Sequence, residues 1–380
     1  MRLIFVSHSL PPADNPSSNI GGMQRVAQDL FDALRQRDDI ELIPIVLRSS
    51  WAETHRRVVP FLFRVYRSVG RIARHDGADA VLFSSMVTAS LSVPLRKKLH
   101  RAGIRSASIV HGLDVTTPAA AYQWFVPRVF GALDTVFPIS RATRDACIER
   151  GLNPEKARVV PNGISMARFA NDGPTGRDRS TLAQIAAAAG VDTASLQSER
   201  SLLLASVGRH VKRKGFVWFI DNVLPTLPEH VSYWLAGEGP EDEEIRSVIS
   251  RHGLQDRVHL LGRVSDELLA ALYRGADLFV MPNIRVPGDM EGFGVVLLEA
   301  ALNGMPAVAA GIEGILDVVA DGQNGVLVES GNAAAFREAI AAFDSDRARL
   351  TDLSRSAREY TSRNFAWASV ADRYIESLRV

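Results

Sequence analysis

Short apolar runs recur along this chain with one helix length between them, and this rhythm restricts the fold more than any other feature of the sequence. In the first half the runs cover residues 3–7, 42–47, 80–83, 107–110, 135–139 and 159–160. In the second half they cover residues 202–207, 231–236, 258–261, 278–281, 306–310 and 326–328. Buried parallel strands are continuous apolar runs, and a crossover helix joins each pair. The sequence therefore predicts an α/β protein with two doubly wound parallel sheets.

The chain of 380 residues is longer than one hydrophobic core usually serves, so two domains are expected. A polar stretch from residue 171 to residue 200, with an alanine-rich helical segment inside it, separates the two sets of runs. We place the first domain at residues 1–170 and the second at residues 171–360, followed by a terminal segment at residues 361–380.

Composition limits the class of protein. The single cysteine, Cys147, excludes an internal disulfide and a cysteine-rich metal site, and it fits a reduced cytoplasmic setting. The first apolar run is too short for a secretory segment and no run is long enough to span a bilayer, so a soluble or peripheral protein is expected.

Charge is unevenly distributed. Residues 1–165 hold 22 of the 44 Lys and Arg but only 14 of the 43 Asp and Glu. This asymmetry predicts different partners for the two halves. The net charge of +1 does not suggest a nucleic-acid binder.

Two glycines bracket a cluster of cations directly after the run at residues 202–207. Gly208 and Arg209 open this octet, and Lys214 and Gly215 close it before a predicted helix. Ligands bind beyond the carboxyl ends of parallel strands, where Arg can offer a planar pair of donors and Lys a compact charge to a diphosphate. The alternative is a solvated basic turn.

A glycine-rich loop from residue 287 to Gly294 leads into an apolar helix that ends near Asn303. Glycines at a helix N-terminus let backbone N–H groups approach an anion, and the helix dipole favours negative charge there. Glu291 precedes the helix and Glu299 lies within it, so one carboxylate can bind sugar hydroxyls and the other a ribose diol. The alternatives are a helix-dipole residue for Glu291 and an exposed helical glutamate for Glu299. Because the helix is apolar nearly all round, we expect Glu299 to be buried and paired.

Together these segments resemble a known family. Glu291 and Glu299, with seven residues between them, resemble the paired-glutamate motif of the retaining glycosyltransferase family four, and the octet is similar to that family's diphosphate-binding loop. Residues 276–282 and 325–328 also look like landmarks of the family. The resemblance implies the GT-B fold, in which two Rossmann-like domains face each other across a cleft. The first would lie on the acceptor side, the second would bind a nucleotide sugar, and the terminal segment would be a helix that crosses back onto the first domain.

The same resemblance implies roles for single residues in the second half. Arg209 and Lys214 would hold the diphosphate, Glu291 the donor sugar and Glu299 the ribose. Further donor-binding candidates are Gly208, Arg263, Gly292, Phe293, Gly294 and Val295.

In the first half, candidate residues lie in two glycine-containing segments. Gly21 and Gly22 precede a predicted helix, and the resemblance implies that their loop lies against the donor phosphates and the acceptor. A flexible loop tip is the alternative. His111 follows the run at residues 107–110 and matches the family's histidine near the donor sugar, where a polar contact rather than general-base catalysis is expected. Asp114 is a candidate for contact with the acceptor.

The segment from residue 56 to residue 74 combines basic and apolar residues at helical spacing. Arg64, Arg67, Arg71 and Arg74 share one face of the predicted helix. Such a helix can lie on an anionic membrane surface, whereas the alternative is a solvated basic face over a core-facing stripe. A peripheral position at the inner membrane face is therefore left open beside a cytoplasmic one.

The expected activity is transfer of a hexose, with retention, from a nucleotide diphosphate sugar to a hydroxyl of a glycan or a lipid-linked acceptor. His111, Arg209, Lys214 and Glu291 are the catalytic candidates. No metal or other cofactor is expected, because the D-x-D match at residues 344–346 lies in a polar stretch and not after a strand. GDP-mannose, UDP-glucose and UDP-N-acetylhexosamine stay open as donors. GDP-mannose is slightly favoured by the basic first half and by a loop before Glu291 that is similar to that of mannosyltransferases acting on lipid acceptors.

Two other classes of protein stay open. A sugar-nucleotide epimerase of GT-B-like fold is the nearest enzyme alternative, and a non-catalytic sugar-binding protein is the alternative outside enzymes. A nicotinamide enzyme is disfavoured because no G-x-G-x-x-G pattern opens a helix.

Overall fold

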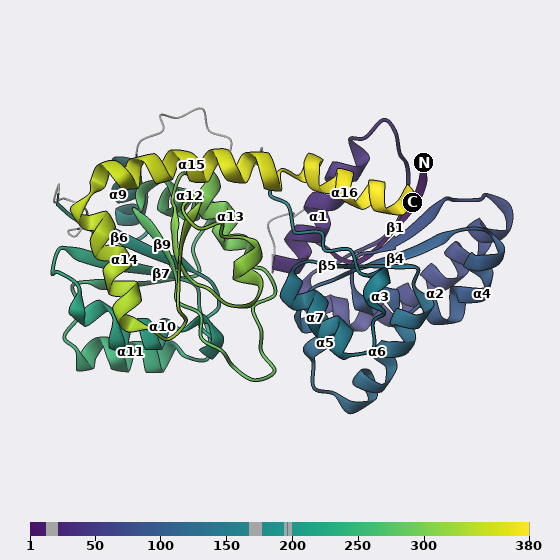
Figure 1. Cartoon of the computed structure of the whole chain (residues 1–380), viewed down its shortest axis with the longest axis horizontal. Coiled ribbons are helices and arrows are strands. Elements are labelled where there is room, and N and C mark those ends of the chain that lie inside the picture. Colours follow the sequence, from purple (N-terminus) through teal and green to yellow (C-terminus); the bar gives the residue numbers. More distant parts are fainter. Residues whose placement is uncertain (13–21, 167–176, 194–195, 197–199, 380) are drawn as a thin grey trace. The chain divides into compact units, whose positions relative to one another are not determined.

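The computed structural model describes residues 1–12, 22–166, 177–193, 196 and 200–379. The chain divides into two compact units. Unit 1 contains Met1–Ser165 and Phe365–Val380, and unit 2 contains Met166–Asn364. Each unit has its own parallel sheet with helices on both faces (Figure 1).

Unit 1 is built on a five-stranded sheet in the order β2-β1-β3-β4-β5. Its strands are β1 (Arg2–Leu10), β2 (Glu41–Arg48), β3 (Ala80–Phe83), β4 (Arg105–Val110) and β5 (Thr135–Pro138). All neighbouring strands are parallel, and Leu3 of β1 lies opposite Leu42 on one side and Ala80 on the other. Strands β2 and β3 lie on opposite sides of β1, so the strand order reverses at β1.

The helices of unit 1 follow its strands in alternation. They are α1 (Gly22–Arg35), α2 (Trp51–His75), α3 (Met86–Ala89), α4 (Ser92–Arg101), α5 (Leu113–Thr116), α6 (Ala120–Ala132), α7 (Arg141–Glu149) and α16 (Trp367–Arg379). Helix α16 comes from the end of the chain and packs against α1. Ile164 donates its backbone N–H to the carbonyl of Phe365 at 2.8 Å, which joins the last residues of the chain to the strand-rich part of unit 1.

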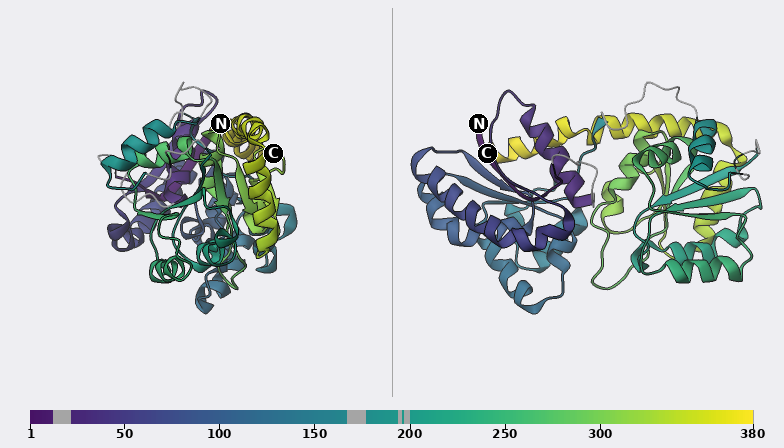
Figure 2. Two further views of the ribbon diagram at one scale, coloured as in Figure 1. Left: turned by 90° about the vertical axis from the view of Figure 1, so that its left-hand side faces the viewer. Right: turned by 180° about the vertical axis from the view of Figure 1, so that it is seen from behind.

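Unit 2 is built on a six-stranded parallel sheet in the order β11-β10-β9-β6-β7-β8 (Figure 2). Its strands are β6 (Leu202–Val207), β7 (Val231–Ala236), β8 (Val258–Gly262), β9 (Leu278–Met281), β10 (Ala307–Ala310) and β11 (Gly325–Val328). Its α-helices are α9 (Arg179–Ala188), α10 (Phe216–Asn222), α11 (Asp242–Arg251), α12 (Asp266–Gly275), α13 (Val295–Leu302), α14 (Ala333–Ser345) and α15 (Arg347–Phe365). The strand order reverses between β6 and β9, which is where ligands bind in doubly wound sheets.

The prediction of two doubly wound parallel sheets is confirmed. One predicted strand is wrong, because residues 159–160 form no strand. The chain does run beside β5 there, and Arg158 and Val160 donate to the carbonyls of Val136 and Pro138 at 2.9 and 3.1 Å. Strand β5 ends at Pro138, so the pairing stops there and leaves only an isolated bridge between Val136 and Ala157.

A buried carboxylate ties the start of β9 to two other parts of unit 2. Asp277 is buried and accepts the backbone N–H of Leu203 at 2.6 Å. Its two carboxylate oxygens pair with the guanidinium groups of Arg177 and Arg179, and Arg347 of α15 lies 3.7 Å away. Buried charges are stable only when paired in this way.

In the described residues, no helix combines the length and apolarity that crossing a bilayer requires.

Candidate functional site

The two loops predicted to bind a ligand leave the sheet of unit 2 from neighbouring strands. Strands β6 and β9 are paired, so the loop after Val207 and the loop after Met281 begin side by side at one edge of the sheet. Ile284 of the second loop donates its N–H to the carbonyl of Arg213 in the first at 2.9 Å. Tertiary structure therefore brings the octet and the glycine-rich loop together.

Gly215 permits this close approach. Its φ of +68° lies in the left-handed region, and a Cβ atom at this position would lie 2.0 Å from the carbonyl oxygen of Pro282. A side chain would meet both a steric clash and an unfavourable backbone conformation. The residue that closes the octet thus has to be glycine for the two loops to touch.

The centre of the site is an ion pair between Lys214 and Glu291. The Nζ atom of Lys214 lies 2.6 Å from Oε2 of Glu291, and the two residues are 7% and 8% exposed. Asn283 donates its side-chain N–H to the same oxygen at 3.2 Å. Burial disfavours the charged form of Glu291, but the charges of Lys214 and Arg213 and these hydrogen bonds outweigh it, and the pKa of Glu291 lies below its ordinary value. The site therefore holds an ionised carboxylate beside a buried ammonium group.

Arg213 was not among the predicted site residues, although it lies inside the octet. Its Nε is 3.7 Å from Oε2 of Glu291, and its Nη1 is 3.1 Å from Oδ1 of Asp289. Arg209, which was predicted, is exposed. A position in the same strand-to-helix loop was the signal that could have identified Arg213, but only the fold decides which cation of the octet faces Glu291.

Helix α13 begins beside this pair. Gly294 precedes its first residue, Val295, with φ of +87°, and no side chain caps the helix. The N–H groups of the first turn of a helix have no partner within the helix, so they can bind an anion. Gly292, Phe293, Gly294 and Val295 were predicted together as donor-binding residues, and they form one continuous stretch between Glu291 and the helix.

Glu299 lies buried within α13. Its Oε2 accepts a hydrogen bond from the hydroxyl of Tyr273 on α12 at 2.8 Å. Tyr273 was not predicted, because no local pattern links residue 273 to residue 299.

Of the two remaining predicted residues of unit 2, Gly208 lies beside the Lys214–Glu291 pair and Arg263 does not. Gly208 lies beside Lys214, and a Cβ atom there would be 3.5 Å from the Lys214 Cε. Arg263 follows β8, is largely exposed and pairs with Glu238 at 3.0 Å. Arg263 therefore does not belong to either of the two loops that hold the Lys214–Glu291 pair.

In unit 1, polar residues gather at the carboxyl ends of β1, β3 and β4. The Nε2 of His111 lies 3.0 Å from the carbonyl oxygen of Ser84, so this nitrogen carries the hydrogen and donates it. Asp114 accepts the backbone N–H of His111 at 3.2 Å, and this contact caps the turn after β4. Gly22 is exposed at the first position of α1, and Gly21 lies outside the described residues.

His8 was not predicted as part of this cluster. Its Nδ1 lies 3.3 Å from the Ser85 hydroxyl, and both side chains are buried. Burial and the nearby His111 lower the pKa of His8 to about 4, so its imidazole is neutral at physiological pH. His8 lies within β1, and no local sequence pattern indicates that it joins these polar residues.

The D-x-D segment is engaged in structural contacts. Asp344 accepts from Arg347 at 2.7 Å and from His230 at 2.8 Å, and Asp346 accepts the backbone N–H of Arg349 at the start of α15. Within the described ranges, no group of three His, Cys, Asp or Glu side chains is arranged to hold a metal ion.

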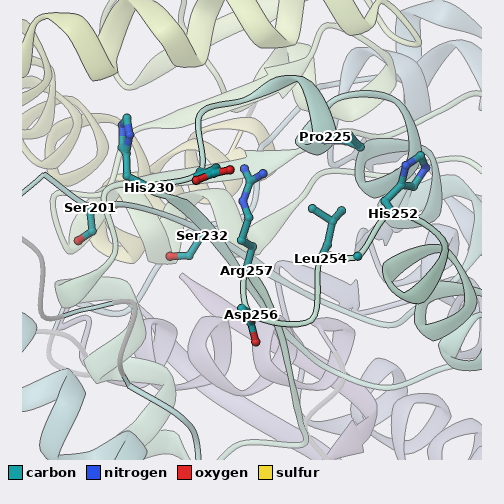
Figure 3. A pocket seen from close by; sticks show the side chains of 10 residues that line it. Ser201, Pro225, His230, Ser232, His252, Leu254, Asp256 and Arg257 are labelled. Carbon is teal, nitrogen blue, oxygen red and sulfur yellow. The ribbon is translucent and has the colours of Figure 1, made fainter.

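A cavity of about 550 Å³ opens at the other edge of the unit 2 sheet, near the amino ends of β6, β7 and β8 (Figure 3). Arg257 lies at its centre, but its guanidinium donates to the carbonyls of Val231 and Pro228, each at 3.0 Å. These bonds fix the loop before β7. Because ligands of doubly wound sheets bind at the carboxyl ends of the strands, this cavity is not the candidate site.

Comparison with known proteins gives two adjacent family matches. Residues 20–168 match the model described as "Glycosyltransferase Family 4", and residues 192–360 match the model described as "Glycosyl transferases group 1". The chain is similar to the putative colanic acid biosynthesis glycosyltransferase WcaL of Salmonella typhimurium, with 28% identity over 70% of this chain and 63% of the relative. It is also similar to a D-inositol 3-phosphate glycosyltransferase of Salinispora tropica, with 30% identity over 75% of this chain and 58% of the relative. The chain thus spans less than two thirds of the length of these relatives.

A third relative is the GDP-mannose-dependent alpha-(1-6)-phosphatidylinositol monomannoside mannosyltransferase of Mycobacterium tuberculosis, with 27% identity over 81% of this chain and 77% of the relative. Among solved structures, Anabaena Alr3699/HepE in complex with UDP matches with a TM-score of 0.74 and 19% identity, over 100% of both chains. The catalytic domain of starch synthase IV from Arabidopsis thaliana, bound to ADP and acarbose, matches with a TM-score of 0.75 and 16% identity, over 100% of this chain and 99% of the other. At these identities the likeness shows the fold, and the expected GT-B class with two Rossmann-like units is confirmed.

Proposed function

Since the chain belongs to glycosyltransferase family four, we propose that it transfers a hexose from a nucleotide diphosphate sugar to an acceptor hydroxyl, with retention at the anomeric carbon. The observation that carries this proposal is the buried Lys214–Glu291 pair beside the uncapped start of α13. Positive charge and free N–H groups at one point suit a diphosphate, and a carboxylate next to them suits sugar hydroxyls.

Lys214 has the hydrogen-bonding capacity for this role. An ammonium group has three donors, and Glu291 takes one of them, so two remain for phosphate oxygens. As the bond between the sugar and the diphosphate breaks, negative charge grows on the departing oxygen. Lys214, Arg209 and the N–H groups at the start of α13 would stabilise that charge. Glu299 would bind the ribose diol of the nucleotide.

The reaction we propose proceeds on one face of the sugar. The anomeric carbon loses its bond to the donor phosphate oxygen and gains a bond to the acceptor oxygen, and the acceptor proton passes to the departing phosphate. The salt-bridged state of Glu291 favours binding over nucleophilic attack, since its charge is already shared with Lys214. We further propose that the reaction needs no metal ion, so activity should survive treatment with EDTA.

His111 is proposed to make a polar contact with the donor sugar. Because its Nε2 already donates to Ser84, its Nδ1 carries a lone pair that can accept from a hydroxyl. The role of Asp114 is proposed to be indirect, since it holds the backbone of His111.

A second proposal concerns a membrane partner. The exposed Lys and Arg of α2, α4 and α6, which we call the basic face, are Arg56, Arg57, Arg64, Arg67, Arg71, Arg74, Arg96, Lys97, Arg101 and Arg128. Helix α4 contacts both α2 and α6, so the three helices form one layer. Their only acidic residue is Glu53. This charge is complementary to an anionic lipid surface.

Exposed apolar side chains accompany the basic face. Phe63 of α2 is 56% exposed and Trp124 of α6 is 64% exposed. The guanidinium of Arg67 lies 4.2 Å from the Phe63 ring centroid, and that of Arg128 lies 3.4 Å from the Trp124 centroid. Aromatic residues with neighbouring cations are suited to the headgroup region of a bilayer. This surface supports peripheral contact with an anionic membrane and a lipid-linked acceptor.

The proposed transferase activity is tested by ligand binding followed by turnover. Thermal unfolding is measured with GDP-mannose, UDP-glucose, UDP-N-acetylglucosamine and the matching nucleoside diphosphates, because a ligand that binds the folded state raises the unfolding temperature. We expect one nucleotide sugar and its nucleoside diphosphate to raise the unfolding temperature of the protein, which would identify the base of the donor. Failure of every nucleotide and nucleotide sugar to stabilise the protein would overturn the proposal.

Turnover separates the remaining alternatives. A transferase releases nucleoside diphosphate faster when an acceptor extract is added, and the anomeric configuration of its product can be read by NMR. Epimerised nucleotide sugar formed without an acceptor would instead identify an epimerase. Binding without either product would identify a sugar-binding protein.

A further inference from the structure

Glu313 has an unusual backbone conformation. It is the non-glycine residue with a positive φ, +50°, in the described part of the chain. It follows β10 and begins the short 3₁₀ helix η5 (Glu313–Asp317). A side chain in the left-handed region is unfavourable for most residues, and such strain persists where the surroundings require it.

Glu313 and the next residue, Gly314, together bind the backbone N–H and the backbone carbonyl of Glu291. The backbone N–H of Glu291 donates to Oε2 of Glu313 at 2.5 Å. The backbone carbonyl of Glu291 accepts the N–H of Gly314, the next residue, at 3.0 Å. A Cβ atom at Gly314 would lie 2.2 Å from the carbonyl oxygen of Gly292, so the two segments are in direct backbone contact. The conformation of Glu313 therefore directs its own carboxylate and the next N–H to one residue.

The carboxylate of Glu313 is also costly to keep there. Burial raises its pKa and the nearby charge of Glu291 adds to this, while the hydrogen bond from Glu291 and the charges of Arg285 and Arg213 oppose it. Strain and desolvation thus fall on one side chain. Strained residues persist where the surrounding structure holds them, and they cluster at functional sites.

We propose that Glu313 is a positioning residue that fixes the backbone of Glu291 and thereby aims the Glu291 carboxylate at Lys214 and at the donor sugar. This inference rests on the proposed function for the identity of the ligand. The hydrogen bond itself can be tested without any ligand.

Three substitutions separate the contact from the strain. Glu313→Gln keeps an acceptor oxygen and the strained backbone. Glu313→Ala removes the oxygen and keeps the strain, whereas Glu313→Gly removes both, because glycine adopts positive φ without steric cost. Glu338→Ala, at an exposed position of α14, is the matched control.

The first measurement is amide hydrogen exchange of a peptide that contains Glu291, in the full chain without ligand. We expect exchange in Glu313→Ala and Glu313→Gly to be faster by about tenfold or more, because the N–H loses its acceptor, with Glu313→Gln and Glu338→Ala close to wild type. Unchanged exchange in both truncating variants overturns the positioning role, whatever the ligand is.

The second measurement uses the nucleotide sugar that stabilises the wild-type protein and its nucleoside diphosphate. Glu313→Ala and Glu313→Gly should lose turnover to about the same extent, by about tenfold, and bind the nucleoside diphosphate normally. Glu313→Gly should nevertheless unfold at a higher temperature than Glu313→Ala. If activity instead follows the order of stability, Glu313 has only a structural role. If the wild-type protein binds no nucleotide, the proposed function fails, and the exchange result still decides whether Glu313 holds Glu291.

Discussion

The ammonium group of Lys214 lies 2.6 Å from a carboxylate oxygen of Glu291, although 77 positions separate the two residues in the chain. Both side chains are largely buried, so removing one partner leaves the charge of the other with little access to water. The pair joins the loop after β6 to the loop after β9. It therefore connects the loop that we propose binds the diphosphate with the loop that we propose binds the sugar.

Removal of either charge should strongly reduce catalysis. We expect Lys214→Ala and Glu291→Ala each to lower kcat by about 10²–10³, the effect typical of losing one preorganised electrostatic contact. The double variant should lose little more than either single variant, since the residues act as a unit. Lys212→Ala is the matched control, because Lys212 lies in the same turn but is exposed. Circular dichroism checks the fold, and near-normal turnover in both single variants would contradict the assignment.

The burial of His8 should make the stability of the protein depend on pH. Its folded pKa of about 4 lies below the ordinary value of 6.5, so between these values the unfolded chain binds more protons than the folded one. The free energy of unfolding should therefore be highest above pH 6.5 and should fall as the pH decreases towards 4. His8→Gln cannot be protonated, and its thermal unfolding midpoint should fall less over this range. Parallel curves for the two proteins would show that folding does not lower the pKa of His8.

Gly215 should tolerate no side chain. Gly215→Ala combines a positive φ with a Cβ position 2.0 Å from the Pro282 oxygen, so the free energy of unfolding should fall by about 3 kcal/mol and donor binding should weaken. Gly322→Ala is the control, because Gly322 has φ of +73° but no atom within 4 Å of the added Cβ. That change should cost about 1 kcal/mol. Urea unfolding measures both, and equal losses would mean that the loops can move apart.

The basic face should bind anionic vesicles in a salt-sensitive manner. Sedimentation with phosphatidylglycerol vesicles should show binding that weakens as salt increases, and vesicles of phosphatidylcholine alone should bind little. The triple variant Arg64→Gln, Arg67→Gln and Arg71→Gln should bind about 10²-fold more weakly, at about 1 kcal/mol for each cation. The control is the double variant Arg355→Gln and Arg363→Gln, which removes two exposed cations of α15. Binding that is absent, or insensitive to salt and to the triple variant, excludes this surface as the membrane contact.

Features that depend on local sequence were predictable. The runs at residues 202–207, 231–236 and 278–281 match strands β6, β7 and β9 at both ends. Helix α13 begins after Gly294, whose backbone is left-handed, and ends before the polar residue Asn303. Continuous apolar runs and glycine boundaries are encoded in a few neighbouring residues, which is why these elements could be located from the sequence.

The partners of the site residues were less predictable. The sequence indicated Lys214 and Glu291 as separate candidates, but not their direct ion pair, and it indicated neither Arg213 nor Glu313. Whether Arg209 or Arg213 faces the carboxylate depends on how the octet turns, and that turn depends on Pro282 lying against Gly215. Contacts between residues far apart in the chain therefore decide which arginine faces the carboxylate.

By itself, the sequence determined which segments become strands and helices, that they form two doubly wound parallel sheets, and which two loops leave the carboxyl ends of strands. The tertiary structure decided that β6 and β9 are neighbours, that Lys214 meets Glu291, and that Glu313 holds the backbone of Glu291. The physical reason is range. Strand and helix preferences act over a few residues, whereas the pairing of buried charges depends on the order in which strands pack and on which side chains that order leaves without water.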